Sequence, residues 1–432
     1  MVITQFLGIQ SLPEVANKLF KKFALLSVVR YFLGNLSSTF FILYAVDRIG
    51  FELAGVVLAL QLLVQFILDY PSGSLGDYIG QKWVMALSFF ISTIFFYLLS
   101  IATSFNMFVV LAIVGGIADA QSSGTLESWF DSNYQRSVNS EDSERKIYGF
   151  GLSRISTLTR IFMALAFIIG GYVATTYNRE SVFLLQAILC IIFAILALLL
   201  MNDVYSEKIE EQRKSLTQYF SVFIGGIKFL IESKTSFFFL LGIALINVCF
   251  TIWWQLLLFP IYFGYSGSDS IASIFRTIIF FIGIPIGFYM AKVSIKIATE
   301  KVSTFYLLGI IFYNLSFITL LTLLPPEDSL NIAGLTITAI ILTVANTGLL
   351  DIAGTLQGRT MVDLVPSENR NSVYSLIPSL VSILGIPLLP ITGSLIKNWG
   401  LNVGIIVPFL VGLLGTLFMI LSFYFRPKKT LN

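Results

Sequence analysis

The sequence predicts an all-α integral membrane protein with twelve transmembrane helices arranged in two pseudo-symmetric six-helix bundles. Its composition, its apolar segments and the placement of its basic residues carry this prediction. Of the 432 residues, 56% are hydrophobic and only 12% are charged, and the mean hydropathy is +0.87. A soluble fold of this length would need a more highly charged surface, so the composition indicates a chain that lies in a lipid bilayer.

Twelve apolar segments are long enough to cross the membrane, because a spanning helix needs about 20 mostly apolar residues. The segments are continuous rather than alternating, which favours helices over a β-barrel. The expected spans are 23–46, 53–76, 82–102, 105–128, 148–176, 181–202, 236–264, 270–294, 302–324, 331–357, 372–396 and 402–425.

A polar stretch divides these spans six and six. We expect an N-terminal bundle at 1–202, a cytoplasmic linker at 203–235 and a C-terminal bundle at 236–432. Within the linker, residues 216–232 place aromatic and aliphatic side chains at helical spacing, which predicts an amphipathic helix at the membrane surface. A solvated linker with a helical extension of the seventh span is the alternative.

The basic residues set the orientation. If the N-terminus is cytoplasmic, twenty of the 27 Lys and Arg residues lie on the cytoplasmic side, three on the outer side and four inside spans. This asymmetry follows the positive-inside rule through every loop. We therefore expect a multi-pass protein of the plasma membrane with both termini in the cytoplasm.

Several chemistries are excluded by what the sequence lacks. It has no His, which removes His-ligated metals, Ser-His-Asp catalysis and imidazole proton switches. Cys190 and Cys249 stand alone in apolar runs, and no phosphate-binding loop occurs. We expect a protein that is not an enzyme, binds no metal or cofactor, and has no nucleic-acid partner.

An internal repeat supports the two halves. Gly124-Thr-Leu-Glu-Ser128 ends the fourth span, and Gly354-Thr-Leu-Gln-Gly358 ends the tenth. Each is followed by a short polar loop that carries an acid and a base. The two segments occupy equivalent places in a layout of six plus six spans, as expected for a duplicated bundle.

The loop between the second and third spans carries the clearest motif, Gly73-Ser-Leu-Gly-Asp77-Tyr-Ile-Gly80-Gln-Lys82. It resembles the loop G-x-L-x-D-[RK]-x-G-[RK]-[RK] of the major facilitator superfamily, at the position where that family has it. Two basic positions of the motif are Tyr and Gln here, so Lys82 alone remains at its end. Gly73 permits close helix contact, Gly80 permits a tight turn, and Asp77 can cap a helix or pair with a base.

This resemblance implies an alternating-access transporter that works as a monomer, with the loop as a conformational gate. The segment Glu127-Ser-Trp-Phe-Asp131-Ser132 looks like the family's acidic end of the fourth helix, which implies that Asp131 joins the Asp77 network. In the fifth span only Gly170-Gly171 matches the G-x-x-x-G-P-x-x-G-G motif of proton-coupled exporters.

Ionisable side chains inside spans indicate a functional or structural role, because each raises the free energy of membrane insertion by at least about 2.5–3.5 kcal/mol. Depth along the helices places Asp119 and Arg160 near the midplane, and Glu127 and Arg154 nearer the cytoplasm. These pairs either line a substrate cavity or fix the fourth helix to the fifth. For Glu127 and Arg154 the structural latch is the favoured interpretation.

Three further charged residues are candidates for substrate binding or coupling. Arg30, two turns into the first span, either reaches the cavity or extends to the cytoplasmic interface. Arg276 lies in the outer half of the eighth span and Asp351 in the inner half of the tenth. Because burial favours the neutral form of a carboxyl group, Asp351 and Asp119 are the proton-coupling candidates.

Aromatic side chains suggest the character of the cavity. Trp253 and Trp254 in the seventh span offer stacking surfaces toward it, and a lipid-facing aromatic cluster is the alternative. With few charges near the midplane, the sequence favours a proton-coupled secondary transporter that exports a small organic or amphiphilic compound. Proton-coupled uptake of a polar nutrient is one alternative. A non-transporting membrane receptor or scaffold of transporter fold is the alternative from another class.

The predicted orientation is tested by a cysteine at Ser140, in the loop after the fourth span. Because this loop is expected in the cytoplasm, Ser140→Cys should be protected from an impermeant thiol reagent in intact cells and react after lysis. Labelling in intact cells would overturn the topology.

Overall fold

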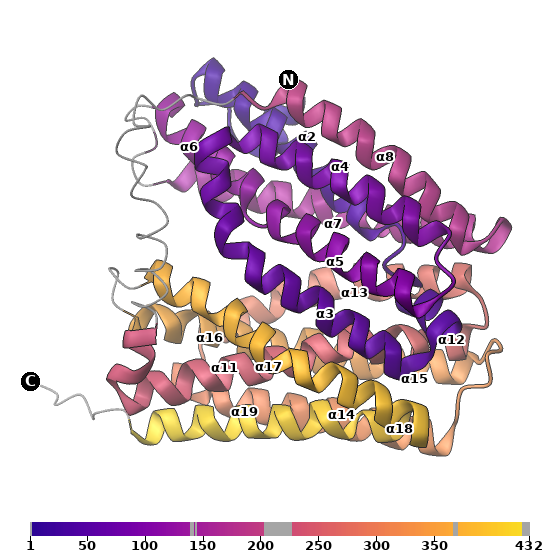
Figure 1. Ribbon diagram of the computed structural model, residues 1–432. Helices are drawn as coiled ribbons and strands as arrows, with labels where there is room; N and C mark the ends of the chain where they lie inside the picture. Colours follow the sequence, from indigo (N-terminus) through magenta and orange to yellow (C-terminus); the bar gives the residue numbers. More distant parts are fainter. Residues whose placement is uncertain (1, 139–141, 143–144, 203–226, 366–369, 426–432) are drawn as a thin grey trace, which may run out of the picture. The chain divides into compact units, whose positions relative to one another are not determined.

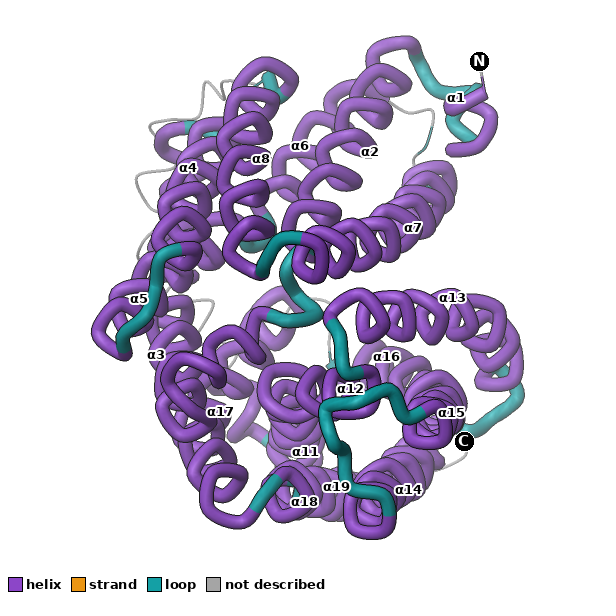
Figure 2. The backbone as a smooth tube through the Cα atoms, turned by 90° about the vertical axis from the view of Figure 1, so that its right-hand side faces the viewer, coloured by secondary structure: helices purple, strands orange, loops and turns teal. Residues whose placement is uncertain are grey.

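We describe the protein from a computed structural model. The described part comprises residues 2–138, 142, 145–202, 227–365 and 370–425, without the side chains of 2, 70–74, 77–78, 370–372 and 374–375. Within it the chain is helical and no strand occurs (Figures 1 and 2). Eleven stretches of this part are long and apolar enough to cross a membrane. The chain divides into two compact units, one formed by Met1–Phe41 with Val64–Leu216 and the other by Ile42–Leu63 with Thr217–Asn432.

The first unit is a bundle of helices joined by short connections. Within it α4 packs against α5 and α8, and α2 packs against α6 and α7 (Figure 1). Its elements are α1 (Val2–Leu7), α2 (Glu14–Asn35), the second part of α3 (Phe41–Ile79), α4 (Gln81–Ser100), α5 (Phe105–Ser122), α6 (Thr125–Val138), α7 (Lys146–Thr176) and α8 (Arg179–Leu200).

The second unit is built around α11, which packs along α19 and α17. Two of its spans change helix type partway along: a π-helix follows α11 and another follows α15. Its elements are α11 (Lys234–Ile252), η1 (Trp253–Leu257), α12 (Leu258–Ser266), α13 (Asp269–Ser294), η2 (Thr299–Lys301), α14 (Val302–Leu323), α15 (Ile332–Leu342), η3 (Thr343–Leu350), α16 (Asp351–Leu364), α17 (Arg370–Trp399), α18 (Leu401–Gly404) and α19 (Ile406–Tyr424).

The first two spans divide differently from the expected ranges 23–46 and 53–76. Helix α2 ends at Asn35, and α3 starts at Phe41 and runs to Ile79, with a non-helical Gly50 at φ 75°. Polar side chains explain the break after α2. The Ser38 hydroxyl donates to the Asn35 carbonyl at 3.0 Å, and the Asn35 amide donates to the Tyr31 carbonyl at 2.7 Å. Such local hydrogen bonds compete with the helix.

Helix α2 is not among the eleven apolar stretches, because it carries four basic residues. Its side chains nevertheless pack inside the first unit, where Phe20, Leu26 and Leu33 are buried. Its basic residues are Lys18, Lys21, Lys22 and Arg30.

In the second unit, the first part of α3 lies in backbone contact with α17. A Cβ added at Gly55 would lie 2.6 Å from the Leu389 carbonyl oxygen, and one at Gly393 would lie 2.3 Å from that of Phe51. Small residues thus allow these helices to approach closely, as is common inside membranes. Lys397 forms an ion pair with Glu52 along the same contact.

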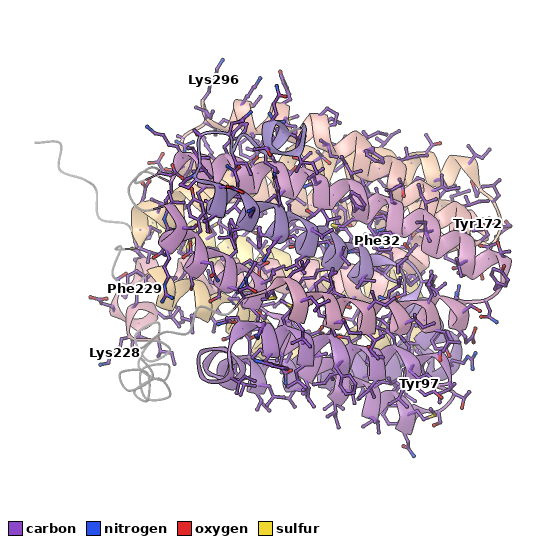
Figure 3. The ribbon with its side chains drawn as sticks, turned by 90° about the horizontal axis from the view of Figure 1, so that it is seen from above. Phe32, Tyr97, Tyr172, Lys228, Phe229 and Lys296 are labelled. Atoms are coloured by element: carbon purple, nitrogen blue, oxygen red, sulfur yellow. The ribbon has the colours of Figure 1, made fainter. Side chains whose placement is uncertain are left out.

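Some exposed tyrosine side chains lie near helix ends, which is where a membrane meets water. In the first unit, Tyr97 on α4 and Tyr172 on α7 are exposed near the ends of their helices (Figure 3). The predicted amphipathic helix at 216–232 falls mostly outside the described residues. Residues 227–232 are helical, Phe229 joins the hydrophobic core of the second unit, and Lys228 is exposed (Figure 3).

Candidate functional site

The fourth span is broken in its polar half. Helix α5 ends at Ser122, Gly124 adopts φ +68°, and α6 starts at Thr125. A left-handed φ favours glycine because a Cβ would be strained there. The break interrupts the hydrogen-bond ladder, so carbonyl groups in the last turn of α5 need donors from elsewhere.

Arg30 of α2 supplies donors to both sides of this break. Its Nη2 donates to the Ser122 carbonyl at 3.0 Å, and its Nη1 donates to the two Glu127 carboxylate oxygens at 3.1 and 3.2 Å. A cation thus lies at the C-terminus of α5, and an anion lies in the first turn of α6, which suits both helix dipoles. The Arg30 side chain is 21% exposed and that of Glu127 is 51% exposed, so the pair is not enclosed by the bundle.

Other polar groups gather at the same break. The Thr125 hydroxyl donates to the Gln121 carbonyl at 2.6 Å, and Ser123 forms a hydrogen bond with Asp69 of α3. The buried Gln121 Oε1 has no hydrogen-bond partner within the described part of the chain. We call the group Arg30, Asp69, Gln121, Ser122 and Glu127 the α5–α6 cluster.

Glu127 is therefore held by Arg30, and Arg154 makes a different contact. The Arg154 guanidinium lies over the rings of Phe6 and Phe150, 5.4 and 4.9 Å from their centroids. Helix α1 folds back beside α2 and α7 (Figure 2). Its Leu7 side chain is fully buried. This packing brings the N-terminal Phe6 to Arg154, and cation–π contacts of this kind favour arginine.

The expected pair of Asp119 and Arg160 is not among the contacts seen. Both side chains are exposed, and Arg160 has no ion-pair partner in the ranges that the structure describes. Their roles in binding or coupling therefore stay predictions.

Asp131 is held by the loop that follows its own helix. Arg145 donates to its Oδ1 at 3.1 Å, and the Gln135 amide donates to its Oδ2 at 2.8 Å. Asp142 in the same loop accepts from the backbone N–H of Tyr148 at 2.9 Å, which caps α7. Partial burial acts to raise the pKa of Asp142, but hydrogen bonds from Tyr148 and from Tyr134 outweigh it and hold that pKa below its ordinary value.

The predicted gate loop is described only in part. Gly80 ends α3 at φ +96°, as a tight turn requires, and the Lys82 ammonium lies over the Trp83 ring. Gly73 and Asp77 belong to the end of α3, but the Asp77 side chain lies outside the described residues. The link between Asp77 and Asp131 stays a prediction.

The tenth span also loses regular helix geometry, at the π-helix η3 between α15 and α16. Asp351 is the first residue of α16 and is exposed. A Cβ at Gly287 of α13 would lie 3.3 Å from Asp351 Oδ2, and one at Gly283 would lie 3.5 Å from Thr347 Oγ1. Glycines on α13 thus make room for polar side chains of η3 and α16. Isolated π-turns occur frequently at functional sites.

A cavity of about 450 Å³ lies against one face of α16. Arg359 links α16 to the C-terminus of α13. Its Nη1 donates to the carbonyls of Ser294 at 3.0 Å and Ile297 at 3.2 Å. This role of Arg359 could not be predicted from the sequence, because its partners are the carbonyls of residues 62 and 65 positions away. The cavity is lined by Thr355, Gly358, Arg359, Val362 and Asp363.

The aromatic candidates differ in position. Trp253 is 1% exposed and donates to Asn314 Oδ1 at 3.0 Å, so it packs inside the bundle. Trp254 is 46% exposed and remains a candidate for contact with a solute. Arg276 lies over the Phe259 ring, 4.6 Å from its centroid, and interacts with Tyr262.

These features fit a membrane transporter with charged groups at interrupted helices. No group of three metal-ligating side chains occurs within the described part. A sequence profile of the Major Facilitator Superfamily matches residues 23–377, most of the chain. The chain belongs to this superfamily.

Solved structures of other major facilitators share the fold. The nucleoside transporter NupG is 14% identical, with a TM-score of 0.70 and coverage of 95% of this chain and 100% of the other. A bacterial homologue of the human lysosomal transporter Spinster is 13% identical, with a TM-score of 0.68 and coverage of 96% and 98%. A D-xylose–proton symporter is 13% identical, with a TM-score of 0.67 and coverage of 96% and 99%. No curated protein sequence matches this chain.

The two repeat glycines provide a test of the break in this major facilitator. Neither Gly124 nor Gly354 has an atom within 4 Å of an added Cβ, but only Gly124 has a positive φ. Gly124→Ala should therefore lower stability by about 1–2 kcal/mol and reduce transport. Gly354→Ala, inside α16, should be neutral or stabilising by about 0.5–1 kcal/mol. Thermal unfolding in detergent and solute uptake measure both effects, and equal effects would contradict the assigned role of Gly124.

Proposed function

We propose that this major facilitator is a proton-coupled secondary transporter of a small polar organic solute. The supporting observation is that the fourth and tenth spans, which carry the internal repeat, both depart from α-helical geometry beside acidic residues. Interrupted helices inside a membrane typically mark solute and ion sites. Alternating access is the mechanism that membership of the family implies.

Protons are the proposed coupling ion, and Asp119 and Asp351 are two candidate carriers. Both are exposed carboxylates beside a helix interruption, where a proton exchanges with water. Moving one charge through 100 mV supplies about 2.3 kcal/mol, which at full coupling gives roughly fiftyfold accumulation of solute.

A polar solute now fits better than the amphiphile favoured by the sequence. Trp253 is buried, whereas the side chains of Arg30 and Glu127 are 21% and 51% exposed. Two of the similar structures are named as transporters of a nucleoside and of D-xylose, both polar molecules. Uptake driven by the proton gradient is therefore the preferred direction, with the protein in the plasma membrane, both termini in the cytoplasm and a monomer as the working unit.

Export of an amphiphilic compound is the second candidate function. The half-exposed Trp254 favours it, because an exposed indole ring offers a stacking surface to an apolar solute.

Proton movement into proteoliposomes with a trapped pH dye tests the proposal. An imposed pH gradient and a panel of sugars, nucleosides, organic anions and amphiphilic cations would be applied to wild type, Asp119→Asn and Asp351→Asn. We expect solute-triggered proton flux in wild type that is reduced at least about tenfold in a variant that lacks the coupling acid.

The outcomes separate the candidates. Flux with polar solutes supports the proposal, and flux with amphiphiles alone supports export. No flux from folded protein with any solute contradicts proton-coupled transport and favours the non-transporting receptor or scaffold.

A further inference from the structure

We propose that Arg30 binds an anionic group of the transported solute, a carboxylate or phosphate, and that Glu127 takes up the coupled proton when the solute displaces it. This inference rests on the proposed transport function and names its substrate class and a coupling acid. It differs from the depth-based candidates Asp119 and Asp351, because it follows from an observed contact between two side chains.

The geometry of Arg30 makes one of its partners exchangeable. Its Nη2 is bound to the backbone carbonyl of Ser122, which fixes the guanidinium at the end of α5. Its Nη1 donates to both carboxylate oxygens of Glu127, which lies 97 residues away in sequence. The Glu127 side chain is 51% exposed. A guanidinium has five N–H donors in a planar fork that matches carboxylate and phosphate. A solute anion therefore can replace Glu127 while Ser122 stays bound.

Charge balance then couples the solute to a proton. Before binding, the Arg30 cation and the Glu127 anion neutralise each other. When a solute carboxylate takes the place of Glu127, one cation faces two carboxylates at a helix break in a membrane protein. Two carboxylates that share one cation repel each other, which favours protonation of one of them. One proton from solution then bonds to a Glu127 oxygen, and the site returns to neutrality with one anion and one proton bound.

The basic side chains that flank this region have partners of their own. Tyr148 of α7 interacts with Glu127, Arg145 just before α7 pairs with Asp131, and Arg154 of α7 lies over aromatic rings. The start of α4 contributes Lys82, whose ammonium lies over Trp83.

The neighbouring acids Asp69 and Asp119 also favour protonation of Glu127. Asp69 of α3 is hydrogen-bonded to Ser123, and Asp119 lies in the last turn of α5, whose carbonyl accepts from Ser123 N–H. Both add negative charge near the break, so an arriving anion increases the preference of Glu127 for a proton.

The coupling is reciprocal. If the solute favours proton binding at Glu127, protons must favour solute binding at Arg30 by the same factor. Affinity for the anion should rise as pH falls, and each transported anion should carry one proton per negative charge engaged at Arg30.

Proteoliposomes with a trapped pH dye test this with membrane-impermeant probes. Sodium gluconate, glucuronate, succinate and glucose 6-phosphate would be compared with glucose and sorbitol, and protein-free vesicles subtracted. We expect proton flux with at least one anion and a much smaller response to the neutral sugars. Arg30→Gln should reduce the anion response about tenfold or more.

Glu127→Gln separates binding from coupling, because the amide keeps the shape and cannot titrate. We expect this variant to bind the same anion, measured by its protection against thermal unfolding, without the pH dependence seen in wild type and without proton flux. Glu52→Gln removes a carboxylate from another ion pair, with Lys397, and should retain flux within about twofold. Thermal unfolding of each variant checks that it is folded.

The results distinguish this inference from the proposed function. Flux driven by neutral sugars and retained by Arg30→Gln would overturn the anion site and leave transport standing. Unchanged anion-driven proton flux in Glu127→Gln would overturn the coupling role. No flux with any solute from folded wild type would overturn both.

Discussion

The constraint on which this structure depends is that a backbone carbonyl freed inside a membrane must find a donor within the protein. At Gly124 the fourth span loses its helical ladder, and the guanidinium of Arg30 serves the freed carbonyl of Ser122. The same group holds Glu127 at the start of the next helix. One side chain of α2 thus joins the two parts of a broken span, and the break carries an ion pair that the bundle does not enclose.

The two bundles share a topology, but the residues at equivalent repeat positions differ in charge and in backbone conformation. At the repeat positions, Glu127 pairs with Arg30, whereas the neutral Gln357 accepts a hydrogen bond from the Tyr306 hydroxyl at 2.6 Å. Gly124 breaks its span with a left-handed turn, while Gly354 lies inside α16 after the π-helix η3. A titratable contact in one half and a neutral one in the other would confine proton exchange at these positions to the first bundle.

The helical membrane fold was predictable, because apolar run length and the Lys and Arg pattern depend on local composition. The superfamily was recognised by the resemblance of the loop Gly73–Lys82 to its motif. The presence of charges inside spans, Arg30 and Glu127 included, was also visible. Their pairing was not: depth counting matched Glu127 with a residue on the next helix, whereas its partner lies 97 residues away. The expectation also missed α1, whose Phe6 covers Arg154, and the break after Asn35, where side-chain hydrogen bonds override an apolar run.

A double-mutant cycle of unfolding free energy in detergent tests the central claim, that Arg30 bridges Ser122 and Glu127. Arg30→Gln should lower the unfolding free energy more than Glu127→Gln does, because it also leaves the Ser122 carbonyl without its donor. Glu127→Gln should cost little once Arg30 is replaced, with a coupling energy of about 0.5–3 kcal/mol. Additive effects of the two substitutions would contradict the bridge.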